Sequence, residues 1–381
     1  MSTGNLEPLR YPIVMLIKGK RELPQNLRAI LLVQLGDIGD VVLTTPTLRT
    51  LRDNFPTCTL IVALREKARE LIEDSPWVSD VTYVSKAKRT LGEELAFQTR
   101  FFSALRKHRF DLAIDLRTGT RGAILAYLSG APLRIGRYAE DGTLWRNRLF
   151  THLVRPENEL SQHCAEHGLN LLAPFGLETP NKSPELFVSL EKERRASSIL
   201  GRENVPLGKP AIAFQPFSLW GYKDWGAEKY VALIEWIRKR FAVPVLIMGS
   251  TDEESRADQM ARQCGPGVYN LAGRTSLGEL AAVLKNSALF IGGDSAGVHI
   301  AAAVGTPTVS LFGPSSPVSW APRGEEHEVV SKNWACVPCR AKGCQNSERS
   351  RCLEELTPEE VKSVVERRLL NLLASSKRPR G

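Results

Sequence analysis

The chain has 381 residues, of which 43% are hydrophobic and 24% charged, and its formal net charge is +9. This length exceeds one ordinary hydrophobic core and therefore predicts two domains in a globular protein. No apolar run approaches the about 18 residues of a membrane span, and the early stretch "YPIVMLI" lacks the order of charge, apolar segment and cleavage site of a signal peptide. We therefore expect a cytoplasmic location.

The excess of basic residues indicates either an ordinary solvated surface or an anionic partner. The sequence contains no recognisable nucleic-acid-binding module and no zinc-finger spacing with paired histidines. Anionic small molecules or a lipid surface are therefore the expected partners, rather than nucleic acid.

Apolar strand runs alternate with helical patterns along most of the chain. The expected strands span residues 29–35, 58–64, 81–85, 111–116, 211–217, 243–249, 288–293 and 307–313. The expected helices span residues 47–55, 94–108, 227–241, 277–286, 296–305 and 357–373. Fully apolar strands separated by helices predict parallel sheets covered on both faces.

The pattern runs twice and breaks near residues 175–210, which are rich in Pro, Gly and Asn. We therefore predict an α/β fold with two Rossmann-like, doubly wound domains that face each other across a cleft. The expected segments are an N-terminal extension (1–27), a first domain (28–180), a linker region (181–204), a second domain (205–355) and a C-terminal helix with a basic tail (356–381).

The last helix should begin with Thr357 as N-cap and Pro358 at its first position. We expect it to return across the first domain, and we expect the tail "SSKRPRG" to be disordered.

The first strand runs into "GDIGD", which is neither a dinucleotide fingerprint nor a phosphate-binding P-loop. Gly36 and Gly39 would let this turn take positive φ and let a ligand come close. Asp40 stands at or beside the helix N-terminus, where an aspartate commonly caps. One aspartate suffices for capping, so the other of Asp37 and Asp40 is a candidate general base.

Two segments after strands of the second domain carry candidate donor-binding residues. "FQPFSLWGYKDW" offers the Ser218 hydroxyl and the Lys223 cation on a loop, although Lys223 is equally compatible with an ordinary surface lysine. "DSAGVHIAAAVG" places small residues at a helix N-terminus, which suits a phosphate group. There Asp294 either caps the helix or serves the ligand, and His299 either makes a structural hydrogen bond or faces the same phosphate.

These residues together suit transfer of a glycosyl group from a nucleotide diphosphate sugar, with the aspartate on the opposite domain. No Asp-x-Asp pair occurs in the sequence, so nothing indicates a metal ion on the diphosphate. Four cysteines cluster as Cys336-x2-Cys339-x4-Cys344-x7-Cys352. They are either a zinc site of non-standard spacing or a cysteine-rich surface loop.

The chain resembles glycosyltransferase family 9, the lipopolysaccharide core heptosyltransferases. The resemblance covers most of the chain and rests on "ILLVQLGDIGDVVLTTPTLRTLRDNFP", "IDLRTGTRGAILAYLSGAPLRIGR", "FQPFSLWGYKDW" and "LAGRTSLGELAAVLKNSALFIGGDSAGVHIAAAVGTPTVSLFGPSSP". The cysteine cluster before "EELTPEEV" is similar to that of members close to heptosyltransferase II.

The resemblance implies the GT-B fold and an inverting, metal-independent transfer of heptose from ADP-heptose to the phosphorylated inner core of lipopolysaccharide, without a required cofactor. It implies Asp40 as the catalytic base. The implied donor-binding residues are Ser218, Lys223, Asp294, Ser295, Ala296, Gly297 and His299. The family glycine before the histidine is replaced by Ala296, and a glycine follows at Gly297.

The candidate acceptor-binding residues are Gly39, Arg117 and Arg121, with Arg134 and Arg137 as weaker candidates. The arginines are equally compatible with an ordinary basic surface. We take a monomer as the default and expect it to associate peripherally with the cytoplasmic face of the inner membrane, where "PIVMLIKGKR" would add a surface contact. Three alternatives stay open: a transferase of the same fold that uses another nucleotide sugar, a sugar-nucleotide epimerase, and a catalytically silent binding protein.

Overall fold

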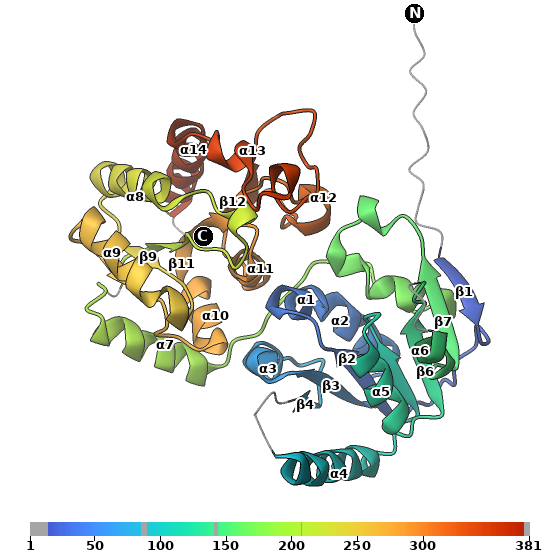
Figure 1. Ribbon diagram of the computed structural model, residues 1–381. Helices are drawn as coiled ribbons and strands as arrows, with labels where there is room; N and C mark the ends of the chain where they lie inside the picture. Colours follow the sequence, from blue (N-terminus) through green and yellow to red (C-terminus); the bar gives the residue numbers. More distant parts are fainter. Residues whose placement is uncertain (1–13, 85–89, 141–143, 207, 377–381) are drawn as a thin grey trace, which may run out of the picture. The chain divides into compact units, whose positions relative to one another are not determined.

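The computed structural model describes residues 14–84, 90–140, 144–206 and 208–376, and it divides into two compact units (Figure 1). The first unit comprises Met1–Gly36, Pro46–Glu66 and Trp77–Lys182. The second comprises Asp37–Thr45, Lys67–Pro76 and Ser183–Gly381. Two short segments that follow strands of the first sheet therefore belong to the second unit.

The first unit contains a seven-stranded sheet with the order β1-β7-β6-β5-β2-β3-β4. Its strands are β1 (Val14–Lys18), β2 (Ala29–Gln34), β3 (Thr59–Arg65), β4 (Asp80–Val84), β5 (Leu112–Asp115), β6 (Leu133–Arg137) and β7 (His152–Pro156). All neighbouring strands are parallel except β1, which pairs antiparallel with β7. Every residue of β2 is buried, as expected for a central strand covered on both faces.

The second unit contains a six-stranded, fully parallel sheet with the order β10-β9-β8-β11-β12-β13. Its strands are β8 (Ala211–Gln215), β9 (Val245–Ile247), β10 (Val268–Asn270), β11 (Ser287–Gly293), β12 (Thr308–Leu311) and β13 (His327–Val330).

The helices of the first unit are α2 (Thr45–Asn54), α4 (Leu91–Lys107), α5 (Thr120–Leu128) and α6 (Leu144–Arg148). Those of the second unit are α1 (Ile38–Leu43), α3 (Arg69–Ile72), α7 (Leu190–Arg202), α8 (Ala227–Phe241), α9 (Glu254–Cys264), α10 (Leu277–Lys285), α11 (Ala296–Ala303), α12 (Pro317–Trp320), α13 (Arg351–Glu354) and α14 (Pro358–Ser376). Short 3-10 helices are η1 (Glu66–Ala68), η2 (Glu159–Ser161), η3 (Cys164–Glu166), η4 (Leu169–Leu171), η5 (Ala173–Phe175), η6 (Gly221–Lys223), η7 (Thr251–Glu253) and η8 (Cys344–Asn346). Within the described residues, none of these helices combines the length and the apolar character needed to cross a bilayer.

In both sheets the series of parallel strands starts at a central strand, and the chain builds one side of the sheet before it returns to build the other side. The reversal of strand order falls between β2 and β5 in the first sheet and between β8 and β11 in the second. Ligands of open α/β sheets bind at the carboxyl ends of the strands at such a reversal. The four segments that follow these strands carry the candidate residues for catalysis and for donor and acceptor binding, except the weaker acceptor candidates Arg134 and Arg137, which lie in β6.

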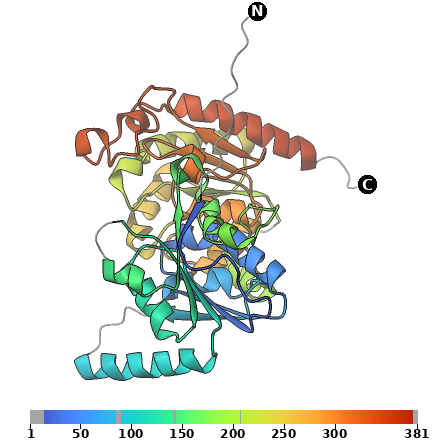
Figure 2. The same cartoon turned by 90° about the vertical axis from the view of Figure 1, so that its right-hand side faces the viewer.

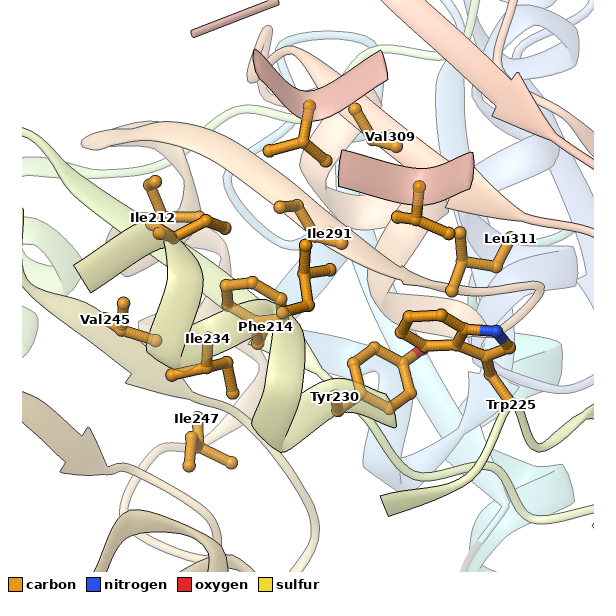
Figure 3. Packing of buried hydrophobic residues seen from close by; sticks show 14 of the residues in the cluster. Ile212, Phe214, Trp225, Tyr230, Ile234, Val245, Ile247, Ile291, Val309 and Leu311 are labelled. Carbon is orange, nitrogen blue, oxygen red and sulfur yellow. The ribbon is translucent and has the colours of Figure 1, made fainter. Parts of the chain in front are cut away.

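The core of the second unit is built around an aromatic pair (Figure 3). The Trp225 ring meets the Tyr230 ring edge-on, with centroids 4.8 Å apart, and Tyr230 lies edge-on to Phe214 of β8. The Trp225 indole N–H donates to the Leu356 carbonyl at 2.8 Å, so its one polar atom is satisfied inside the core. This pair anchors the chain immediately after the loop that carries Lys223.

Helix α14 begins as predicted but packs differently. Thr357 donates its N–H to the Glu360 carboxylate at 2.8 Å and accepts the Glu360 N–H at 3.3 Å, which closes a capping box before Pro358. Its buried residues Val361 and Val365 join the core of the second unit, so the expected return across the first domain is wrong. Figure 2 shows α14, in red, as one uninterrupted helix.

Several elements were missing from the sequence interpretation. The five unpredicted strands are β1, β6, β7, β10 and β13, each of only three to five residues. β1 lies within the expected N-terminal extension, and α7 within the expected linker region. Residues 1–13 of that extension and residues 377–381 of the basic tail lie outside the described residues.

A buried ion pair supports the loop after β5. Arg146 of α6 is fully buried, and its Nη2 lies 3.1 Å from the Asp115 carboxylate, which is 1% exposed. The same guanidinium donates to the Arg117 carbonyl at 2.5 Å and to the Arg137 carbonyl at 2.7 Å. Burial raises the pKa of Asp115 to about 7, against the opposing effect of the Arg146 cation. The pair therefore holds the loop that leads to Arg121.

Arg146→Met should lower the free energy of unfolding by about 3–5 kcal/mol, because it leaves the Asp115 carboxylate buried without its cation. The raised pKa means that the folded protein holds this proton where the unfolded chain has released it. This carboxyl's contribution to stability therefore falls as pH rises from about 4 to about 7. The deficit of the variant should accordingly be larger near pH 8 than near pH 5 in urea denaturation. The double variant Asp115→Asn/Arg146→Met should lose less, and an equal loss at both pH values would contradict this account.

Candidate active site

The segment "GDIGD" forms the start of α1, and both aspartates take part in capping it. Asp37 is the N-cap, and the Asp40 carboxylate, three residues on, accepts the Asp37 N–H at 2.9 Å. The two therefore form a capping box. A carboxylate has about four lone-pair sites on two oxygens, so capping does not by itself exhaust the acceptor capacity of Asp40.

Helix α1 packs against α11 within the second unit, and Gly39 makes the approach possible. A Cβ atom at Gly39 would lie 3.1 Å from the His299 ring, tighter than ordinary contact. Neither Gly36 nor Gly39 is among the positive-φ residues, so the prediction of positive φ is wrong. Gly39 is needed here for space, and its neighbour is His299.

His299 lies on the inner side of α11 and is buried. Burial lowers the pKa of His299; the Lys223 cation lowers it further, while Asp294 and Asp40 act in the opposite direction. The imidazole is therefore neutral at physiological pH, when one ring nitrogen donates and the other accepts. Its ring also lies 6.1 Å from the ring of Trp320, a residue that the sequence interpretation did not single out.

Lys223 and Asp294 form an ion pair between the loop after β8 and the end of β11. Lys223 Nζ lies 2.6 Å from Asp294 Oδ2, and the Asp294 side chain is only 5% exposed. The N-cap of α11 is Ser295, so Asp294 does not have the capping role considered for it. The pair places a cation beside the N-terminus of α11.

The loop that carries Lys223 is braced by the cysteine-bearing segment. Ser350 Oγ donates to the Tyr222 carbonyl at 2.7 Å, and the Glu348 carbonyl lies against Gly221. Ser218 accepts the Trp220 N–H at 3.2 Å within the same loop. Ser218 therefore precedes the 3-10 helix η6 that carries Lys223, and its hydroxyl accepts a hydrogen bond within the loop.

The start of α11 is formed by small residues, Ser295, Ala296 and Gly297. Ser295 Oγ is buried and has no hydrogen-bond partner among the described residues. A Cβ at Gly297 would lie 1.8 Å from Gln215 Oε1, so a side chain there would require the Gln215 side chain to move. Position 297 is therefore the position of this turn where a glycine is favoured, and position 296 can hold an alanine.

Gln215 is a neighbour of this turn that the sequence interpretation missed. It ends β8, and its amide side chain lies over Gly297. The sequence did contain a signal for this residue. Gln215 is the polar last residue of an otherwise apolar strand, immediately before the candidate donor loop.

Of the candidate acceptor residues, Arg117 and Arg121 lie in the first unit, whereas Gly39 lies in the second. The Arg117 N–H donates to Asp115 Oδ1 at 3.2 Å, and Arg121 stands exposed in the first turn of α5. The weaker candidates are engaged in the structure. Arg134 donates to the carbonyls of Leu149 and Ala131, while Arg137 pairs with Glu159.

The four clustered cysteines are not arranged as a set of metal ligands in the described part of the chain. Cys336, Cys339 and Cys344 are exposed and Cys352 is buried, and no three His, Cys, Asp or Glu side chains are grouped to hold an ion there. Burial raises the pKa of the Cys352 thiol. The zinc alternative therefore receives no support from the arrangement of these thiols.

Comparison with known proteins identifies the family. The profile of glycosyltransferase family 9 (heptosyltransferase) matches residues 98–349. Lipopolysaccharide heptosyltransferase 3 of Escherichia coli is 30% identical over 74% of this chain and 83% of its own. Among solved structures, the family 9 glycosyltransferase of Veillonella parvula has a TM-score of 0.79 at 21% identity, covering 92% of this chain and 100% of its own.

The E. coli ADP-heptose lps heptosyltransferase II also shares the fold, with a TM-score of 0.74 at 21% identity over 92% of this chain and 100% of its own. The comparisons do not favour type II over the other types, because the type 3 relative is 30% identical to this chain and the type II structure 21%. The two Rossmann-like α/β units thus have the GT-B fold. The chain belongs to glycosyltransferase family 9 and is a glycosyltransferase.

Proposed function

We propose that this enzyme transfers heptose from ADP-heptose to the phosphorylated inner core of lipopolysaccharide, with inversion and without a metal ion. The observation that carries the proposal is the grouping of Asp40, His299 and the Lys223–Asp294 pair around the N-terminus of α11, all in the second unit. The names of the relatives support heptose as the sugar and lipopolysaccharide as the acceptor.

The donor diphosphate is bound at the N-terminus of α11. There the backbone N–H groups of Ser295, Ala296 and Gly297 and the positive end of the helix dipole favour an anion. Lys223 shifts from Asp294 alone to a position shared between Asp294 and the phosphate. As the bond between sugar and phosphate breaks, negative charge grows on the leaving ADP, and these preorganised groups stabilise it.

Asp40 acts as the general base. The acceptor hydroxyl attacks the anomeric carbon on the face opposite the leaving diphosphate, through an oxocarbenium-like transition state. Asp40 takes the hydroxyl proton, ADP leaves with the electron pair of the broken bond, and the configuration at the anomeric carbon inverts. Neutral His299, packed on Gly39, keeps α1 and α11 in register so that the carboxylate stays beside the donor.

The acceptor is anionic, and Arg117 and Arg121 bind its phosphate groups. Arginine suits this task because its planar guanidinium can donate two parallel hydrogen bonds to phosphate. An acceptor with a lipid anchor places the enzyme, as a monomer, at the cytoplasmic face of the inner membrane. The net charge of +9 supports contact with an anionic surface.

Asp40→Asn should reduce the transfer rate by about 10²–10⁴-fold, because the amide keeps the size and the capping oxygen but cannot accept the proton. The measurement is the rate of product formation from ADP-heptose and heptose-deficient lipopolysaccharide, followed by mass spectrometry. ADP affinity by calorimetry and thermal stability serve as controls and should not change. Near-normal turnover would remove Asp40 from the role of base.

Lys223→Ala should raise KM for the donor and lower kcat, and it should destabilise the fold by about 3 kcal/mol because Asp294 is left buried without its cation. The double variant Lys223→Ala/Asp294→Asn should regain most of the stability but not the donor affinity. Lys285→Ala, which removes a half-exposed pair with Glu193, is the matched control and should change stability by less than about 1 kcal/mol. An unchanged donor KM in both Lys223 variants would rule out its role.

Inversion and metal independence are tested on the same reaction. The anomeric configuration of the transferred sugar, read by NMR, should be opposite to that in the donor, and a chelator should leave the initial rate unchanged. Retention of configuration would overturn the proposed inversion. Loss of activity with chelator that added Mg²⁺ restores would overturn the proposed metal independence. A panel of ADP-, UDP- and GDP-sugars, each with and without acceptor, separates heptose transfer from use of another donor and from epimerisation.

A further inference from the structure

Three large apolar side chains are exposed on α5 and α6, two helices of the first unit that contact each other. Ile124 is 39%, Tyr127 50% and Trp145 47% exposed. On α5, Ile124 and Tyr127 lie three residues apart on the outer side, while the inner side of the helix is buried. We call the outer side of α5 together with Trp145 of α6 the α5/α6 face.

The α5/α6 face is bordered by cations. Arg121 precedes Ile124 by one helical turn on the same side of α5, and Arg148 is exposed at the end of α6. The Arg134 guanidinium lies 5.4 Å from the centre of the Tyr127 ring and is held there by the carbonyls of Leu149 and Ala131. Arg146 and Arg137 do not contribute to this border, because Arg146 is fully buried and Arg137 pairs with Glu159.

We propose that the α5/α6 face docks the first unit onto the surface of an anionic phospholipid bilayer. Trp and Tyr favour the boundary between headgroups and hydrocarbon, where the ring meets apolar chains and the polar atom meets water. Arginines around them extend to the lipid phosphates while their apolar stems stay at the interface. Each basic residue near an anionic leaflet adds about 1 kcal/mol of attraction.

The charge of the face argues against a second copy of this chain as its partner. Two copies joined through the α5/α6 face would bring the same arginines against each other, and like charges facing each other oppose association. An anionic bilayer instead supplies both opposite charge and apolar depth.

The position of the face fits the proposed acceptor, and this step rests on the proposed function. Arg121 belongs both to the border of the face and to the residues proposed to bind acceptor phosphate, and Arg117 lies four residues before it. A lipid-anchored acceptor carries its phosphorylated sugars close to the bilayer surface. Docking through α5 and α6 therefore holds these arginines at the depth where the acceptor headgroup lies.

The test is co-sedimentation of the full-length protein with vesicles of phosphatidylcholine alone and of phosphatidylcholine mixed with phosphatidylglycerol. The wild type should bind the mixed vesicles and not the neutral ones, and high salt should release it. Ile124→Asn/Trp145→Ser should weaken binding about tenfold, because it removes the apolar contact. Arg148→Gln should weaken it about fivefold through loss of one charge.

The matched control is Leu190→Ser, which removes an exposed leucine (70%) from α7 of the second unit and should bind like the wild type. All replaced side chains are exposed, so circular dichroism and the thermal midpoint should stay unchanged. Absence of wild-type binding to anionic vesicles, or equal binding by the α5/α6 variants, overturns the proposal. If the wild type forms dimers in the absence of lipid and Ile124→Asn/Trp145→Ser abolishes them, the face is a protein interface. That result would also overturn the proposal.

A second readout separates this inference from the proposed function. Ile124→Asn/Trp145→Ser should transfer heptose normally to a deacylated, water-soluble acceptor and slowly to acceptor embedded in anionic vesicles. Equal rates on both acceptors would argue against docking through this face. Absence of transfer to either acceptor by the wild type, with vesicle binding intact, would instead contradict the proposed function and leave the docking surface standing.

Discussion

The close approach of Gly39 to His299 is the contact on which the arrangement of the candidate site depends. Because residue 39 has no side chain, α1 can pack directly on α11, and the first turn of α1 carries Asp40 with it. The strand that precedes α1 belongs to the first unit, yet the helix itself belongs to the second. The proposed base and the proposed donor-binding residues are therefore parts of one compact body.

Buried charge is organised at the strand-order reversal of each sheet. In the second unit, Lys223 and Asp294 join the segments that follow β8 and β11. In the first unit, Asp115 at the end of β5 pairs with Arg146 of α6 and supports the loop after that strand. A buried charge is tolerated only with a close partner, so each pair restricts the loop that carries it to one conformation. The loops that carry candidate ligand-binding residues are thus held by buried ion pairs.

The replacement of the family glycine by Ala296 illustrates how a local departure is absorbed. The crowded position is Gly297, where the Gln215 amide occupies the space that a side chain would take. Alanine one position earlier keeps the turn small and leaves its backbone N–H groups accessible to an anion. The steric demand comes from β8, more than eighty residues earlier in the chain, so it is not visible in the local sequence.

The α/β class and most of the long elements could be predicted from the sequence alone, and the candidate site residues could be chosen because they follow strand ends. Alternating apolar strands and amphipathic helices are local signals, and ligand-binding residues follow strand ends in this class of fold. The capping box at Thr357 was likewise readable, because a cap involves residues only three positions apart.

Only the tertiary structure decided which distant residues share a partner. The assignment of α1 and α3 to the second unit, the Lys223–Asp294 and Asp115–Arg146 pairs, and the packing of α14 all join residues far apart in the chain. Short edge strands such as β1 and β13 were also decided there, because a few residues carry too little periodicity and become strands only by pairing with a neighbour. Non-local contacts depend on which elements become neighbours, and no short stretch of sequence contains that information.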